Sequence, residues 1–325
     1  LRRLTREGHT CAAVAKPSGP GLSSSVAVIL SKPTPPSAAP PAVAGADVRV
    51  VTATADTAEE LEADLNAGAA QGFTPCGLTL TAPMWGRPSA YGVVAVLART
   101  STAPTGVGYR VVRSRARRED WARLERAAAD GFIVSRVVTW PAPANMAAAN
   151  TSEIVFLAEK TATSKPTRYE LVFAGNGPAL EKDIAKAVAK GYCAQAAWAT
   201  AERMSVLLAK PIDGPCATPH DYEIEESSRF TVNAADGELL ALFRIKDGTM
   251  ALHDGRNRAV EYSTVEGMLI DGGERVFRLP REHRELIDKL DADGGRGYLP
   301  VDVTWRETGP RGMRAIDVIL SRPRQ

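Results

Sequence analysis

A glycine followed by an aromatic residue recurs along the chain at nearly constant spacing, and this repeat constrains the fold more than any other feature of the sequence. The pairs are Gly72-Phe73, Gly131-Phe132, Gly191-Tyr192 and Gly297-Tyr298, and Gly8-His9 occupies the same place near the start. From Gly8 to Gly191 the glycines lie 64, 59 and 60 residues apart, and the last gap is 106 residues. A regular period predicts tandem copies of one structural unit.

Apolar residues precede the glycines at the spacing of a helix. Seven positions before them stand Leu1, Leu65, Leu124, Ile184 and Leu290, and eleven positions before three of them stand Leu61, Leu180 and Leu286. These two positions lie one turn apart on one helix face, so the pattern predicts an amphipathic helix with a buried stripe. The glycine then follows the end of the helix, where a positive φ is required.

Short runs rich in Val and Ile flank each predicted helix and indicate strands. Nearly identical runs that end the unit occupy 28–33, 206–211 and 318–323. Runs that open the unit occupy 48–51, 109–112, 169–172 and 276–279. A middle strand fits after the glycine-aromatic pair, as at 134–140 and 194–200. Each unit is therefore predicted to be β-α-β-β.

The predicted fold class is α+β, built from tandem β-α-β-β repeats with antiparallel sheets and one helix per repeat. The expected boundaries are a partial first repeat at 1–33, a Pro-rich linker at 34–46, repeats at 47–102, 107–162 and 167–213, a β-rich insertion or degenerate repeat at 217–273, and a last repeat at 274–325. Because Leu1 already stands at a mid-helix position, we expect either that native residues precede it or that the first copy is truncated.

The repeated unit resembles a known family of small domains. A strand opening in Tyr-x-Val-Val, a helix with spaced leucines, the glycine-aromatic pair and a final strand ending in Leu-x-Arg or Leu-x-Lys are similar to the family DUF4177. The chain departs from the usual Gly-Trp pair, with Phe, Tyr or His after the glycine. The resemblance implies tandem copies of that domain. It implies no activity, because the family has none established, and it gives no residue a role.

Composition places the chain among ordinary globular proteins, with 44% hydrophobic and 24% charged residues. The net charge of +2 gives no global preference for nucleic acid or anionic lipid. No apolar run approaches the ~20 residues of a transmembrane helix, so no membrane span is expected. Four cysteines without a CxxC pair predict no disulfide-dense scaffold and leave the cellular compartment open.

Motifs that carry chemistry are absent from the sequence. The four histidines show no HExxH spacing, and neither GxSxG nor a full GxGxxG or Walker A pattern occurs. We therefore predict no catalytic residue, no cofactor and no metal site, and we favour a non-enzymatic protein. An enzymatic or small-ligand site between repeats stays open as an alternative, because such sites can be assembled from distant positions.

Arginines concentrate at the start of the third repeat, where Arg113, Arg115, Arg117 and Arg118 precede or begin the predicted helix. Such a stripe is a candidate contact for nucleic-acid phosphates or other anions. A solvated helix with Glu-Arg pairs is the simpler interpretation, since Glu119, Asp120 and Glu125 lie nearby.

Cys193 and Cys216 are a candidate disulfide pair. Folding the last two strands of the fourth repeat about residues 201–204 brings the start of one strand beside the end of the other. Cys216 lies just past that end, after Gly214-Pro215, so the geometry of a disulfide can be met. The bond requires an oxidising compartment.

These observations favour a structural or partner-binding component of a larger assembly. One unit of about 50 residues has a single sheet and helix to bury, so copies must pack on each other and expose long edges to partners. A protein partner or self-assembly is therefore expected, and contact with nucleic acid through the third-repeat arginines is a further alternative.

Overall fold

The computed structural model of the protein describes residues 10–15, 27–31, 47–54, 58–81, 92–99, 106–114, 118–140, 153–199, 203–216, 221–227, 238–245, 248–254, 260–270, 281–296, 298–307 and 313–323. Helices and antiparallel sheets occur side by side in these residues, which confirms the α+β class. None of the described helices is long and apolar enough to cross a membrane.

Four segments of the chain run in the order strand, helix, strand, strand. The second repeat has β3 (Asp47–Thr54), α2 (Ala58–Ala70), β4 (Phe73–Thr81) and β5 (Gly92–Arg99). The third has β6 (Gly108–Ser114), α3 (Arg118–Ala129), β7 (Ile133–Trp140) and β8 (Glu153–Lys160). The fourth has β9 (Thr167–Ala174), α4 (Gly177–Ala189), β10 (Cys193–Ala199) and β11 (Met204–Pro211). The last has β15 (Val260–Ile270), α5 (Arg281–Gly294), β16 (Leu299–Glu307) and β17 (Met313–Pro323).

Within each of these sheets the last strand lies in the middle. The strand orders are β3-β5-β4, β6-β8-β7, β9-β11-β10 and β15-β17-β16, and every pairing is antiparallel. The middle strands β8 and β11 are buried on both faces, which explains why their sequences are nearly continuous apolar runs. In the first repeat the structure describes β1 (Thr10–Ala15) paired with β2 (Ala27–Ser31).

The β-rich segment before the last repeat has the same strand order as the repeats. It contains β12 (Tyr222–Ser227), β13 (Glu238–Ile245) and β14 (Gly248–Asp254), arranged as β12-β14-β13. The two interpretations of this segment, an insertion or a degenerate repeat, therefore both stay predictions. Residues 228–237, where the other repeats have their helix, lie outside the described residues.

The last sheet begins earlier in the chain than the sequence predicts. Strand β15 falls within the expected insertion at 217–273, but it pairs along its whole length with β17. The expected opening strand at 276–279 lies outside the described residues. Residues 271–280 separate β15 from α5, whereas Gly175 and Asn176 suffice between β9 and α4. The position of β15 therefore cannot be predicted by counting back from Gly297 the number of residues that separates the opening strand from the glycine in the other repeats.

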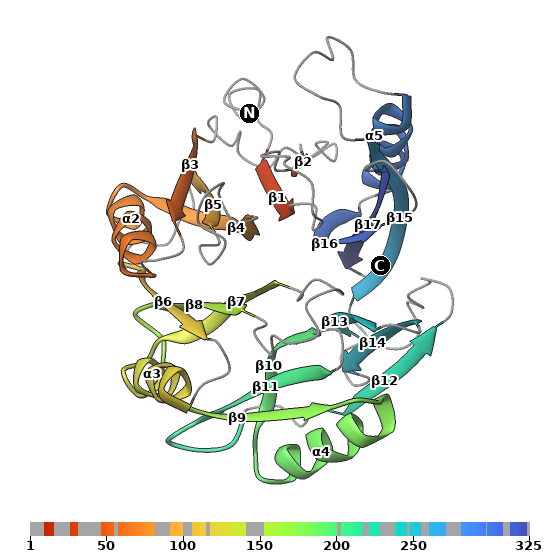
Figure 1. Cartoon of the computed structure of the whole chain (residues 1–325). Coiled ribbons are helices and arrows are strands. Elements are labelled where there is room, and N and C mark those ends of the chain that lie inside the picture. The colour runs from red at the N-terminus through yellow and green to blue at the C-terminus, as the bar shows by residue number, and fades with distance from the viewer. Residues whose placement is uncertain are drawn as a thin grey trace, which may run out of the picture.

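The sheets follow one another in a ring, in chain order (Figure 1). The second strands of successive sheets pack together, with β1 on β4, β4 on β7, β7 on β10 and β10 on β13. Strand β13 lies beside β15, and β16 packs on β1, which brings the last sheet against the first.

Each of the helices α2, α3 and α4 packs between its own sheet and the first strand of the next sheet. Leu61 and Leu65 of α2 share a core with Tyr109 and Val111 of β6. The core around Leu124 of α3 includes residues of the fourth repeat, and the core around Leu180 of α4 includes residues of β12 and β14. One repeat therefore completes the core of its neighbour.

The helices end as the glycine pattern predicts wherever the structure describes the glycine. Gly72, Gly131 and Gly191 have φ of 79°, 88° and 90°. After α3 the amide of Phe132 donates to the carbonyl oxygen of Ala127 and that of Gly131 to Ala128, which is the Schellman arrangement. Gly297 lies outside the described residues. Of the residues seven positions earlier, Leu65, Leu124 and Ile184 are buried, and Leu290 is half-buried.

Replacing Gly191 by Ala is expected to destabilise the protein more than replacing Gly131. Both residues have left-handed φ, where a Cβ costs about 1–2 kcal/mol. A Cβ on Gly191 would lie 2.8 Å from Cβ of Pro215, whereas the nearest atom to a Cβ on Gly131, Cε of Lys160, is 3.6 Å away. Urea unfolding of Gly131→Ala should show the left-handed penalty, and Gly191→Ala a larger loss. An equal or smaller loss at Gly191 would contradict the packing argument.

Candidate functional site

Of the four arginines of the predicted anion site, the structure describes the side chain of Arg113 alone. Arg113 lies half-buried in β6, opposite Val155 of β8. Arg115 and Arg117 lie outside the described residues. Arg118 is the first residue of α3, and its side chain is not among those described.

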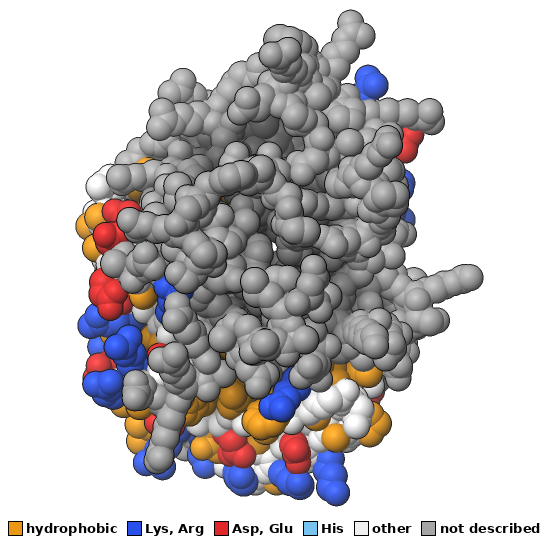
Figure 2. Space-filling model, viewed as in Figure 1, with side chains coloured by type: hydrophobic (Ala, Val, Ile, Leu, Met, Phe, Trp, Pro, Cys, Tyr) orange, Lys and Arg blue, Asp and Glu red, His pale blue; other side chains and the backbone are white. Residues whose placement is uncertain are grey.

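Other basic groups near this place are already engaged. The guanidinium of Arg110 pairs with the carboxylate of Glu62 and lies 5.4 Å from the ring centre of Phe132. The Nε of Arg126 donates to the carbonyl oxygen of Ala122. On the face shown in Figure 2, described side chains of both charge signs alternate with apolar ones. The described charges on this face therefore do not form a stripe of one sign.

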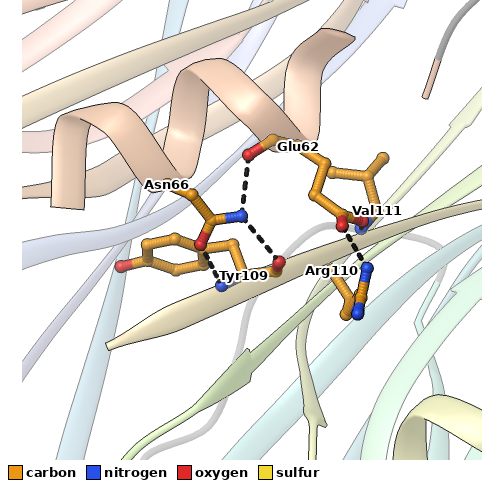
Figure 3. Close-up of polar contacts among 5 residues, drawn as sticks. All are labelled: Glu62, Asn66, Tyr109, Arg110 and Val111. Atoms are coloured by element: carbon orange, nitrogen blue, oxygen red, sulfur yellow. Dashed lines mark hydrogen bonds and ion pairs between the residues drawn. The ribbon is translucent and has the colours of Figure 1, made fainter. Parts of the chain in front are cut away.

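The most specific polar arrangement lies where α2 meets the edge strand β6 (Figure 3). Asn66 accepts from the amide of Tyr109 at 2.9 Å and donates to the carbonyl oxygen of the same residue at 3.0 Å. One turn earlier, Glu62 accepts from the amide of Val111 at 3.0 Å. The Asn66 amide group also donates to the carbonyl oxygen of Glu62 at 2.8 Å, which fixes its orientation.

These two side chains take the place of a neighbouring strand. Tyr109 and Val111 are alternate residues of an edge strand, so their backbone groups point away from β8. An unpaired row of such groups would be open to another strand. Asn66 and Glu62 satisfy the row and set the register between the second and third repeats. Sequence analysis did not identify either residue, because their partners are backbone atoms 43 to 49 positions away.

Hydrogen exchange at individual backbone amides tests whether the side chains of Asn66 and Glu62 take the place of a neighbouring strand. In Asn66→Ala the amide of Tyr109 loses its acceptor, so its hydrogen exchange should accelerate while that of Val111 stays slow. In Glu62→Ala the pattern should reverse. Each variant leaves a part-buried donor without a partner, which costs about 1–3 kcal/mol. Equal acceleration of both amides in either variant would indicate general loosening and would contradict the assignment.

A second set of contacts joins repeats at their β-bulges. The register of each second strand shifts by one residue, for example between Val134 and Arg136 in β7. Beside this bulge, the amide of Val134 donates to the hydroxyl of Tyr169 at 2.8 Å, and its carbonyl oxygen accepts from Nε2 of Gln195 at 2.8 Å. Both partners belong to the fourth repeat. The fourth repeat therefore satisfies backbone groups that the bulge displaces in the third.

The same contact recurs one repeat further along the chain. The amide of Ala194, beside the bulge of β10, donates to the hydroxyl of Tyr222 at 2.8 Å. Tyr222 is the first residue of β12, and Tyr169 lies in β9, the first strand of the fourth repeat. The repeated Tyr of the opening strand is thus both a core residue and a hydrogen-bond acceptor.

Burial of these tyrosines changes their titration. Burial raises the pKa of Tyr169 to about 12, with the hydrogen bond from Val134 acting in the opposite direction. Burial, with a smaller contribution from the carboxylate of Glu159, also raises the pKa of Tyr109 to about 12, and Arg136 lowers it. Both hydroxyls are therefore neutral at physiological pH.

The raised pKa makes stability depend on pH in the alkaline range. A phenol whose pKa is higher in the folded state stabilises the fold fully below its unfolded pKa of about 10, and this contribution is lost as pH rises to about 12. Below pH 10, Tyr169→Phe should be less stable by about 1–3 kcal/mol, because Val134 loses its acceptor. The deficit should shrink between pH 10 and 12. Urea unfolding across that range measures it, and a deficit independent of pH would refute the assignment.

Cys193 and Cys216 are joined by a disulfide, with the sulfur atoms 2.05 Å apart. Cys193 begins β10, and Cys216 lies just past β11. The amide of Cys216 also donates to the carbonyl oxygen of Gly191 at 3.0 Å. The bond therefore fastens the segment after β11 to the end of α4 in the same repeat. A disulfide that closes 23 residues stabilises a fold by roughly 3 kcal/mol in the chain-entropy model.

An aromatic ring stands exposed at the end of β9. Phe173 is 53% exposed, and the guanidinium of Arg203 lies 5.4 Å from its ring centre. Other large apolar side chains with substantial exposure are Ile212, Leu240 and Ile287. Sequence analysis did not identify Phe173, because it continues an apolar pattern in β9 in which Tyr169 and Val172 are buried and Leu171 is half-buried.

Among the described residues, no group of three or more His, Cys, Asp or Glu side chains is placed to hold a metal ion. No protein-family model matches the chain, and no curated protein matches it significantly. The resemblance to the family DUF4177 therefore stays a prediction from the sequence.

Proposed function

We propose that the chain is a non-enzymatic repeat protein that serves as a structural or partner-binding component of a larger assembly. The observation that carries this proposal is the exposed pair of Phe173 and Arg203. Aromatic residues and arginine are enriched at the energetic centres of protein interfaces, where they lose water on binding. Phe173 has half of its surface available for such a contact.

The position of Phe173 explains why its own fold leaves it uncovered. Phe173 and Leu171 lie on one face of β9, the face that packs toward α3 through Tyr169. Tyr169 is buried and Leu171 is half-buried, so the third repeat covers less of each successive side chain on this face and leaves Phe173 exposed. The exposed ring of Phe173 thus adjoins a buried core, and this core gives a partner a rigid surface to bind.

The roles of the polar groups between repeats support a structural interpretation. Glu62, Asn66, Tyr169, Tyr222 and Gln195 each bond to backbone groups of an adjacent repeat. These bonds hold neighbouring sheets in fixed positions and so maintain the surfaces that the sheets present.

Substitution of Phe173 tests the proposal. The full chain, purified from its native source with and without cross-linking, should form an oligomer or a stoichiometric complex. Phe173→Ser should weaken that association by about 30-fold, as expected of a residue contributing about 2 kcal/mol. Ile212→Ser is the matched control, because Ile212 is 49% exposed and lies at the opposite end of the β9-β11 pair.

The same measurement can also contradict the proposal. A chain that sediments as a monomer and co-purifies with no stoichiometric partner would contradict the proposal. So would an association that Phe173→Ser and Ile212→Ser weaken equally.

A further inference from the structure

The strand β9 lies at the edge of its sheet, and part of its outer row of backbone groups is unpaired among the described residues. Directly before β9, the carbonyl oxygen of Pro166 accepts from the amide of Ile212, which directly follows β11. The backbone groups of Pro166 therefore face β11. Because this direction alternates along a strand, the backbone groups of Leu171 and Phe173 face away from β11. No hydrogen bond between described residues reaches these outer groups of Leu171 or Phe173.

The corresponding edge of β6 is satisfied by the helix beside it. Val111 lies 20 positions before Gly131, as Leu171 lies 20 positions before Gly191, and the amide of Val111 donates to Glu62 of α2. Glu62 stands ten positions before the glycine that follows its helix, and in α3 this position is Trp121. An indole has no hydrogen-bond acceptor, so Trp121 cannot replace Glu62. The substitution of side chains for a strand that protects β6 is therefore missing at Leu171.

The side chains at this part of the edge are accessible to a partner. Phe173 is 53% exposed and Leu171 half-buried, and both lie on one face of β9. Directly beyond β9, Gly175 and Asn176 are exposed as well. The guanidinium of Arg203 lies 5.4 Å from the ring centre of Phe173. Unpaired backbone groups, an apolar ring and a positive charge thus occur together at residues 171–174.

We propose that β9 accepts, at residues 171–174, an extended segment of a partner protein that adds a strand to the β9-β11-β10 sheet. The backbone of the segment would bond to the outer groups of Leu171 and Phe173, and one of its apolar side chains would cover the ring of Phe173. This inference rests on the proposed partner-binding function, because it names the chemistry of the partner that contacts Phe173.

Charge complementarity defines the segment further. A guanidinium has several N–H donors, so Arg203 can hold an added carboxylate beside its existing contacts. The segment should therefore carry an acidic residue on the same face as the apolar residue that covers Phe173. Pairing of β9 with β9 of a second copy is less favourable, because it would bring two Arg203 guanidinium groups to the same short edge, where like charges repel.

The test uses the full chain and a random octapeptide library displayed on phage, from which one enriched peptide is synthesised with a fluorescent label. Enriched peptides should contain alternate apolar residues and an acidic residue. Two versions of the peptide are then N-methylated, each on one of the two sets of alternate amides. Their affinities in fluorescence anisotropy should differ at least about tenfold, because one set donates to β9 and the other faces away from it.

Variants of the chain separate the ring from the backbone edge. Phe173→Ser should weaken peptide binding about tenfold through loss of the ring. Phe173→Pro should weaken it further, because proline also lacks the outward N–H, and an edge strand tolerates proline at such a position. Ile212→Ser is the matched control and should leave binding unchanged, and urea unfolding verifies that each variant is folded. In the free chain the amides of Leu171 and Phe173 should exchange quickly, and peptide binding should slow both.

Four results would overturn the inference: no enriched peptide, equal affinities of the two N-methylated versions, slow exchange of the Leu171 and Phe173 amides in the free chain, or a dimer of the chain that the peptide dissociates. The last result would assign the edge to a second copy. The outcome is distinguishable from that for the proposed function. A native association that depends on Phe173, with equal affinities of the N-methylated peptides, removes strand addition alone, whereas a chain without any native association contradicts the proposed function whatever the peptides do.

Discussion

The second, third and fourth repeats do not close their own cores, because each of the helices α2, α3 and α4 is buried between its own sheet and the next. The middle strands β8 and β11 must consequently be apolar on both faces. Small side chains at the contact, such as Ala128 and Ala187, let helix and sheet approach closely. The order of the sheets follows from this shared packing. The removal of one helix would expose two sheets, so stability is distributed over neighbouring repeats.

The apolar contacts in the shared cores do not fix the register between neighbouring repeats, because such contacts are non-directional. Register is supplied by hydrogen bonds that cross between repeats to backbone atoms. The hydroxyls of Tyr169 and Tyr222 each accept from a residue beside a bulge, and Asn66 binds both backbone groups of Tyr109. A slip of one residue would leave these part-buried groups unsatisfied. The bulges are therefore part of the joint between sheets, since they free the backbone groups that the next repeat binds.

Much of this architecture could be predicted from the sequence, because period and glycine position are local properties. The positive φ at Gly131 and Gly191 and the burial of Leu65 follow from the repeated spacing. The opening strand of the last sheet could not be found this way, because the connection before α5 is longer than in the fourth repeat. The roles of Asn66 and Phe173 could not be predicted from the sequence either. They depend on which strand lies opposite, and spacing along the chain does not encode that.

Three joints of the ring are spanned by a described helix, namely α2, α3 and α4. Between the second and third repeats, and again between the third and fourth, a helix spans the joint and contributes a buried leucine to both sides. Between the last and first sheets the described contact is β16 on β1 and β2, and α5 packs on β15 of its own sheet. The helices α2, α3 and α4 therefore link four consecutive sheets, from the second repeat to β12–β14, so the loss of a buried leucine in one of these cores should weaken the sheets on both sides of the helix.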